Sequence, residues 1–155
     1  MQCTIYAPDE LRKKRRIPHQ GVIVLSRHAE APILCRDEIN AMWVLPQGML
    51  SRGESAEETA RRVLGEAIGE AVFDVSLLCG YTVTGEDGKE SGGMAYLADV
   101  TEWPSAGTGT ARTFERMPLA SQVAQPALVF ALHRWAGAFF DARLDVERLG
   151  QPASL

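Results

Sequence analysis

The chain has 155 residues, of which 46% are hydrophobic, and its formal net charge is −4. This size and apolar content predict a single domain with one continuous core. The acidic balance argues against a dedicated partner of duplex nucleic acid, which normally requires a basic face. The sequence has no secretory-signal pattern and no apolar run approaching about 18 residues, so we expect a cytoplasmic protein without a membrane partner.

A basic run at residues 12–16 precedes the first predicted strand. It has two readings, a solvated leader or a patch that attracts phosphate, and the leader is the simpler one. We therefore divide the chain into a basic leader at residues 1–20, with room for an edge strand, a single domain at residues 21–145 and a tail at residues 146–155.

The cysteines and histidines of the chain are few and widely spaced. No Cys-x-x-Cys pair or mixed Cys/His cluster occurs among them, which argues against a zinc site and against a disulfide framework. Reduced thiols are the simplest expectation. The residues concerned are Cys3, Cys35, Cys79, His19, His28 and His133.

Apolar runs rich in β-branched residues predict most of the strands. The first three are at residues 21–25, 32–36 and 42–45. Proline at position 46 and glycine at position 48 then predict a loop, since proline cannot continue a central ladder. Two longer runs, at residues 75–83 and 94–100, predict a hairpin around a polar, glycine-rich turn.

The remainder of the chain is predicted to be a loop, a strand and a helix. Residues 101–110 predict an exposed loop, and residues 112–119 a returning strand. From Pro126 onward, apolar residues recur at helical spacing and predict a C-terminal helix. These residues are Leu128, Ala131, Leu132, Trp135 and Phe139. The order of elements predicts an α/β protein with a mixed sheet between helices.

Local signals predict a further helix between the two groups of strands. Ser55 and Glu58 have the spacing of a capping box, in which each side chain satisfies a free amide at the helix start. The helix should run to about Ile68, with Gly69 in the left-handed conformation that often ends helices. Gly65 costs the helix about 1 kcal/mol relative to alanine, so we expect either a close backbone approach there or a weaker helix.

Residues 48–70 resemble the Nudix box, G-x5-E-x7-R-E-U-x-E-E-x-G-U, in which U is a bulky aliphatic residue. The positions that match are Gly48, Glu54, Arg62, Leu64, Glu66 and Gly69. Val63 and Ala67 stand where two glutamates belong, and Glu70 stands where an aliphatic residue belongs. The segments at residues 43–48 (WVLPQG) and 53–57 (GESAE) are similar to those of the RNA pyrophosphohydrolase and dinucleoside-polyphosphate branches.

The resemblance implies an α/β/α sandwich with a loop-helix-loop box. It also implies hydrolysis of a phosphoanhydride in a nucleotide or other phosphorylated small molecule, with Mg²⁺ or Mn²⁺ as cofactor. Glu66 is the expected catalytic residue and metal ligand, with the Gly48 carbonyl as a second ligand and Glu70 as a weak third. The expected substrate contacts are Gln47, Arg62 and, most weakly, Tyr81. For Tyr81, Tyr96 and Trp103, core packing is the simpler role and base stacking the alternative.

The two missing carboxylates separate the predicted fold from the predicted chemistry. In a helical projection at about 100° per residue, Val63 and Ala67 extend the apolar face of the helix. Arg62 and Glu66 then lie at the solvent-exposed edge of that face. Magnesium takes only a few carboxylates from a protein, so each loss matters. We expect hydrolysis to be weakened or lost. The alternatives are a non-catalytic nucleotide sensor and a protein-interaction module, including a homodimer, neither of which needs a metal.

Overall fold

The computed structural model describes residues 2–13 and 21–144. Residues 14–16 of the basic run, His19 and the predicted tail at residues 146–155 lie outside this part, as does the side chain of Phe139. The expectations placed on these residues stay predictions.

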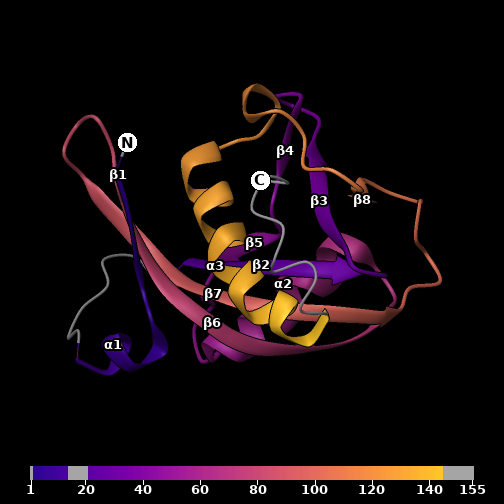
Figure 1. Ribbon diagram of the computed structural model, residues 1–155, viewed down its shortest axis with the longest axis horizontal. Helices are drawn as coiled ribbons and strands as arrows, with labels where there is room; N and C mark the ends of the chain where they lie inside the picture. Colours follow the sequence, from indigo (N-terminus) through magenta and orange to yellow (C-terminus); the bar gives the residue numbers. More distant parts are fainter. Residues whose placement is uncertain (1, 14–20, 145–155) are drawn as a thin grey trace.

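One mixed sheet forms the centre of the fold (Figure 1). Its strands are β1 (Gln2–Tyr6), β2 (Gly21–His28), β3 (Ala31–Asp37), β4 (Met42–Val44), β5 (Gln47–Met49), β6 (Val72–Thr84), β7 (Glu90–Glu102) and β8 (Ala111–Thr113). Their order is β1-β6-β7-β2-β3-β4, with β5 beside β2 and β8 beside β3. The pairing of β2 with β7 is parallel and the other pairings of named strands are antiparallel.

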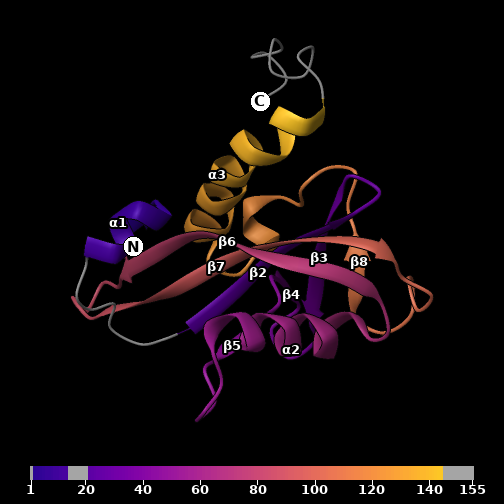
Figure 2. The same cartoon turned by 90° about the horizontal axis from the view of Figure 1, so that it is seen from below.

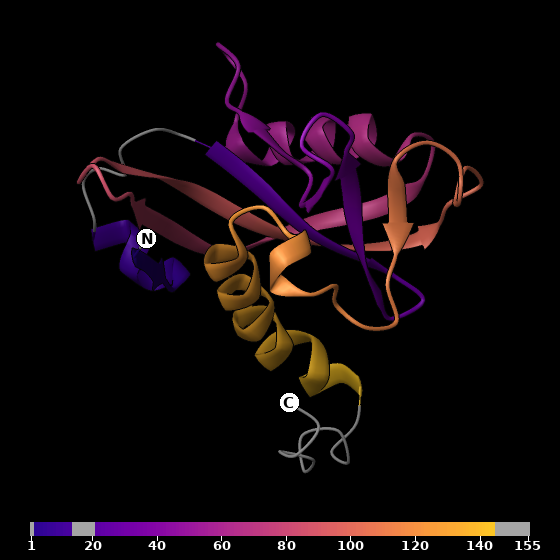
Figure 3. The same cartoon turned by 90° about the horizontal axis from the view of Figure 1, so that it is seen from above.

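Helices cover both faces of this sheet. Helix α2 (Ala56–Ile68) lies on one face, where it contacts β2, β5 and β6. Helix α3 (Pro126–Leu144), preceded by the short 3-10 helix η1 (Ala120–Gln122), lies on the opposite face together with α1 (Pro8–Lys13) (Figures 2 and 3). The predicted α/β/α sandwich is therefore confirmed. In the part of the chain that the structure describes, no helix is long and apolar enough to cross a membrane.

Strand β2 contributes to a separate apolar core on each face. Successive side chains of a strand point to opposite faces, and here both faces are covered. Ile23 and Leu25 pack into the core beneath α3, with Leu128 and Leu132. Val22 and Val24 pack into the core beneath α2. This two-sided burial explains why β2 reads as a continuous apolar run.

The predicted hairpin is present, but its strands are longer and its turn is shorter than expected. The turn covers residues 85–89, where the Gly85 amide donates to the Lys89 carbonyl at 2.9 Å. Gly88 takes a φ of 79°, a conformation that favours glycine. Residues 90–93, predicted as turn, instead pair with the end of β6. The polar composition of residues 90–93 did not indicate this pairing, because it depends on hydrogen bonds with β6.

Two loop predictions are wrong in part. Residues 47–49, at the end of the predicted loop, instead form β5, which pairs with β2. Pro46 does not prevent this pairing, because it lies before the paired residues. Residues 101–102 belong to β7, and the loop that follows is anchored by a buried tryptophan. Trp103 is only 6% exposed, and its indole nitrogen donates to the Ile68 carbonyl at 2.8 Å.

The strand predicted at residues 112–119 shrinks to the three residues of β8. The Phe114 amide still donates to the Pro32 carbonyl at 3.0 Å, and its ring packs edge-on against Trp43. Beyond it Glu115 and Arg116 are exposed, and Pro118 has no amide hydrogen to donate to a ladder. The chain therefore leaves the sheet at this point.

Replacing Gly65 with alanine is expected to stabilise the protein. No atom outside the glycine's immediate surroundings lies within 4 Å of a Cβ built there, so the close backbone approach considered above is absent. The remaining effect is helix propensity, which favours alanine by about 0.5–1 kcal/mol. Chemical denaturation should show this gain in the free energy of unfolding; a loss would mean that the helix surroundings are tighter than described.

Candidate functional site

The box helix begins where its sequence places it. The Ser55 hydroxyl accepts from the Glu58 amide at 3.1 Å, and the Glu58 carboxylate accepts from the Ser55 amide at 3.2 Å. The predicted capping box is therefore present, and Glu58 is occupied by it.

The end of the helix differs from the prediction in one respect. The Gly69 amide closes the last turn by donating to the Gly65 carbonyl at 2.9 Å. Gly69 has a φ of 77° but a ψ of −151°, which lies outside the left-handed helical region. Only glycine adopts this conformation readily. It turns the chain away, and the free Ile68 carbonyl accepts hydrogen bonds from Trp103 and Ser105 instead.

Arg62 ties the helix to the loop before it. Its guanidinium donates to both oxygens of Glu54, at 2.9 and 3.0 Å, and to the Met49 carbonyl at 3.1 Å. The buried hydroxyl of Thr59 donates to the same carboxylate at 2.7 Å. These contacts hold the Arg62 side chain against the loop of the box, and its predicted contact with substrate stays a prediction.

The Glu54 carboxylate should make stability pH-dependent in acid. Hydrogen bonds from Arg62 and Thr59 lower its pKa from an ordinary value of 4.5 to about 2. Stability from this group is therefore complete above the unfolded pKa and is lost as the pH falls from about 4.5 through about 2. In Glu54→Gln we expect a lower melting temperature at neutral pH and a flatter pH profile across this window. Parallel profiles for the two proteins would contradict the assignment.

Val63 lies against Gly48, at one of the two positions where the Nudix box has a glutamate. It is 5% exposed, and its Cγ2 would lie 2.8 Å from a Cβ built on Gly48. Ala67, one turn later, packs against the same core, beside Ile68. The positions that carry carboxylates in a Nudix box are therefore apolar at Val63 and Ala67.

Few carboxylates remain at the box to hold a divalent cation. The Glu66 side chain is 67% exposed and accepts from Arg62 at 3.3 Å. Glu70 lies exposed beyond the helix end. Within residues 2–13 and 21–144, no three or more His, Cys, Asp or Glu side chains are grouped so that they could hold a metal ion. Mg²⁺ usually takes one or two carboxylates and completes its shell with water or substrate oxygens. Glu66 is the box-core carboxylate that could still hold it, with the Gly48 carbonyl as the second predicted ligand.

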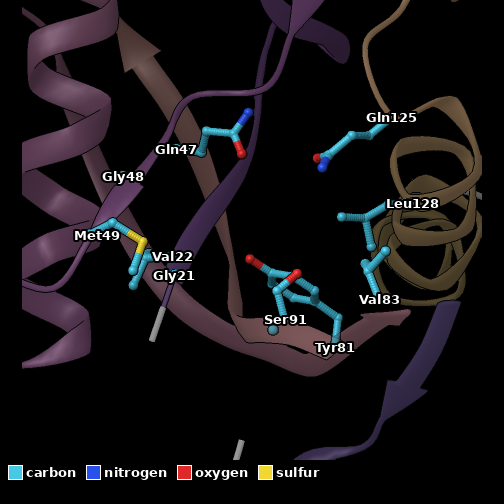
Figure 4. Close-up of a pocket in the computed structure, with 11 residues that line it drawn as sticks. Gly21, Val22, Gln47, Gly48, Met49, Tyr81, Val83, Ser91, Gln125 and Leu128 are labelled. Carbon is cyan, nitrogen blue, oxygen red and sulfur yellow. The ribbon is translucent and has the colours of Figure 1, made fainter. Parts of the chain in front are cut away.

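A cavity of about 310 Å³ opens between β5, the start of β2 and the first turn of α3 (Figure 4). Gln47 and Gln125 extend toward one another from its opposite walls, and the Tyr81 hydroxyl and Ser91 lie at its base. Burial raises the pKa of Tyr81 to about 12, so the phenol keeps its proton at neutral pH. Val22, Val83 and Leu128 supply apolar wall.

A second cavity of about 290 Å³ lies on the box side, and Gln47 lines both. Its walls are about equally polar and apolar. The remaining residues are Cys35, Val44, Leu45, Pro46, Val63, Glu66, Ala67 and Thr110. Burial raises the pKa of Cys35 to about 11, so this thiol stays protonated and is a poor nucleophile.

The structure brings together some of the predicted site residues and leaves others apart. Gln47, Gly48 and Tyr81 line the first cavity, and Gln47 and Glu66 line the second. Arg62 and Glu70 line neither. Gln125 was not predicted; the pre-proline position gave no sign that its side chain would face a cavity built by distant strands.

The remaining candidate aromatic and imidazole groups have structural partners. Tyr96 and Trp103 are buried in the core beneath α2, as the simpler reading predicted. The His28 ring lies 2.7 Å from the Val100 carbonyl, and His133 lies 2.9 Å from the carbonyl of Val129. These four side chains therefore contribute to packing and backbone hydrogen bonding.

Similar proteins are found at both the sequence and the structural level, although no family model matches the chain. An RNA pyrophosphohydrolase from Nitratiruptor sp. is 35% identical over 69 residues, covering 42% of this chain and 44% of the relative. The match thus spans less than half of the curated relative, and its activity does not transfer to this chain by similarity alone.

Solved structures extend the likeness over most of the fold. A pyrophosphohydrolase from Bacillus subtilis has a TM-score of 0.68 and 21% identity, covering 88% of this chain and 90% of its own. A Nudix hydrolase from Nitrosomonas europaea has a TM-score of 0.63 and 19% identity, covering 78% and 90%. The Ap4A hydrolase of C. elegans has a TM-score of 0.60 and 17% identity, covering 80% and 99%. The chain is therefore a Nudix-fold protein, and within that fold it resembles the RNA pyrophosphohydrolase branch.

Proposed function

We propose that this protein binds a nucleotide-type ligand in the cleft beside the box helix, and that phosphoanhydride hydrolysis is greatly weakened or lost. The fold and the retained loop of the box support a nucleotide-type ligand, since the similar proteins act on such molecules by name. The proposed loss of hydrolysis is supported by one observation, the burial of the Val63 side chain against Gly48.

The physical reason lies in the charge of a phosphoanhydride. Water attacks this group readily only when cations neutralise its oxygens and orient the nucleophile. Glu66 alone provides one exposed carboxylate for holding such a cation, and Arg62 already hydrogen bonds to it. Even losing a residue that merely supports a ligand costs about 10–100-fold in affinity or activity, so losing two ligands should cost more.

The test is a hydrolysis assay on the purified full chain. The panel contains triphosphorylated RNA, a dinucleoside polyphosphate, a nucleoside diphosphate sugar and nucleoside triphosphates, each with Mg²⁺ or Mn²⁺. We expect product release close to the uncatalysed background. Robust turnover that disappears in Glu66→Gln, with the variant's melting temperature unchanged, would overturn the proposal, because Glu66 would then be sufficient for catalysis.

A further inference from the structure

We propose that strands β3, β4 and β8 carry, on the α3 side of the sheet, a binding surface for a single-stranded polynucleotide. The surface consists of two arginines and a pair of aromatic side chains, Arg36, Trp43, Arg112 and Phe114, and we call it the arginine–aromatic surface. None of the four lines either cavity, and the ligand is the chain of a nucleic acid rather than a phosphoanhydride. The inference therefore goes beyond the proposed function and does not depend on it.

The strand register places these four side chains on one face of the sheet. Arg36 is the direct partner of Trp43, and Arg112 is the direct partner of Leu34. Leu34 belongs to the core beneath α3, and Trp43 and Phe114 pack against that core. Because directly paired residues share a face and side chains alternate along a strand, both arginines also lie on the α3 side.

Helix α3 leaves this part of the face to smaller side chains and loops. It packs mainly over β1 and β2, whereas β3 and β8 lie side by side at the other end of the sheet (Figures 1 and 3). Arg112 is exposed, and Arg36, Trp43 and Phe114 are half-buried. The arginine–aromatic surface is therefore open to solvent in part and supported from below by the core.

Arg36 and the aromatic pair can stack on a base. The Trp43 and Phe114 rings pack edge-on, with their centroids 4.7 Å apart. The guanidinium carbon of Arg36 lies over the Trp43 ring, 5.3 Å from its centroid, a contact that orients the planar guanidinium. Unpaired bases stack on aromatic rings and on arginine guanidinium planes, and such stacking tolerates any base sequence.

The two guanidinium charges are not neutralised by neighbouring carboxylates. Within residues 2–13 and 21–144, no carboxylate oxygen lies within 4.0 Å of the side-chain nitrogens of Arg36 or Arg112. The Nη1 atom of Arg112 donates to the carbonyls of Gly109 and Ala111, at 2.7 and 2.8 Å. These bonds hold the guanidinium in place without cancelling its charge, so it is preorganised for an anion.

The acidic residues nearest in sequence leave this surface cationic. Asp37 follows Arg36 in β3, so its side chain points to the opposite face, and it accepts hydrogen bonds from amides of the next turn. Glu38 is exposed in that turn, and Glu115 is followed directly by the exposed Arg116. An acidic peptide would satisfy the charges alone. A single-stranded polynucleotide also supplies flat bases for the stacking groups, and it therefore fits the surface better.

The experiment is fluorescence anisotropy with an oligouridylate of about 12 nucleotides, within the usual range of site sizes. The probe carries a 5′-hydroxyl and a 3′-fluorophore, so it contains no phosphoanhydride. Titration with the full chain should give a dissociation constant of about 10⁻⁴–10⁻⁶ M at physiological salt. The logarithm of the binding constant should fall against the logarithm of salt concentration with a slope of about −1.4, for two phosphate contacts. Oligothymidylate of equal length separates RNA from DNA as the source of the strand.

Three arginine variants separate charge from stacking. Arg112→Gln removes one cation and should reduce the salt slope by about 0.7. Arg36→Lys keeps the charge but not the planar group, so binding should weaken about fivefold, the lower limit for one stacked base, with the slope unchanged. Arg61→Gln is the matched control: Arg61 is exposed on α2, at the opposite face, and its loss changes the net charge equally. This variant should bind like the unaltered protein.

Tryptophan fluorescence locates the bound strand. The oligonucleotide should quench part of the intrinsic emission, and that part should be absent in Trp43→Phe, which keeps an aromatic ring. Trp103 packs in the core beneath α2 and Trp135 against the core beneath α3, so neither belongs to the arginine–aromatic surface. Quenching that persists unchanged in Trp43→Phe would place the strand elsewhere and contradict the inference.

The remaining outcomes each decide the question. No binding, or equal affinities and slopes for Arg112→Gln and Arg61→Gln, would overturn the inference; both residues are exposed, so these replacements leave the core intact. A duplex that binds as tightly as the single strand, or polyglutamate that competes equally well, would show that charge alone acts and would overturn the assignment to a single strand. Turnover in the hydrolysis panel would overturn the proposed function and leave the anisotropy result unaffected.

Discussion

The double variant Val63→Glu/Ala67→Glu is expected to hydrolyse at least one member of the phosphoanhydride panel more than about 100-fold faster than the unaltered protein, with Mg²⁺ or Mn²⁺ present. The two substitutions return carboxylates to the positions where the Nudix box has them. Gly48, Glu66 and the loop held by Arg62 and Glu54 are already in place. Initial rates at saturating metal, with both proteins at equal concentration, measure the gain.

The same substitutions should destabilise the metal-free protein. Val63 is 5% exposed and packs on Gly48, so an unpaired carboxylate there would be buried at a cost of several kcal/mol. Metal should restore the melting temperature of this variant and leave that of the unaltered protein unchanged. Val63→Gln/Ala67→Gln is the control of matched shape; equal rates for the glutamate and glutamine variants, both folded, would refute the explanation.

Replacing Gly93 with alanine is expected to cost roughly 3 kcal/mol or more of stability, beyond the usual range for overpacking. Gly93 pairs with Gly21 where β7 and β2 run parallel. A Cβ on Gly93 would collide with backbone atoms of Gly21, including its carbonyl carbon at 2.5 Å. Backbone cannot move aside as a flexible side chain can, so the two strands would have to separate.

Chemical denaturation measures this effect, with Gly65→Ala as the glycine control that meets nothing within 4 Å. The Gly93 substitution should also weaken ligand binding, because Gly21 lines the first cavity. A free energy of unfolding within about 0.5 kcal/mol of the unaltered value, the usual range for harmless surface changes, would show that the strands accommodate a side chain at this crossing.

The elements that could be predicted from the sequence are those whose causes are local. Ser55 and Glu58 cap the box helix within one turn, and Gly69 ends it by a conformation that few other residues accept. The apolar run that forms β2 is buried on both sides of the sheet. In each case the residues that determine the structure are neighbours in the chain.

The elements that escaped prediction depend on distant partners. Residues 47–49 become a strand because the start of β2 lies beside them. Trp103 is buried because the end of α2 leaves the Ile68 carbonyl free to accept its indole hydrogen. Gln125 and Gln47 line the same cavity because the fold brings the start of α3 close to β5. The spacing of residues along the chain does not indicate these long-range contacts.

The box keeps its loop-helix-loop structure but lacks two of the carboxylates that a Nudix box has. Calorimetric titration of Mn²⁺ into the full chain, and into the Val63→Glu/Ala67→Glu variant, measures whether the unaltered box still binds a metal ion. We predict no saturable binding to the unaltered protein and a defined site in the variant. Saturable binding of Mn²⁺ to the unaltered protein that is lost in Glu66→Gln would contradict the account, since a working metal site would then exist without the two missing carboxylates.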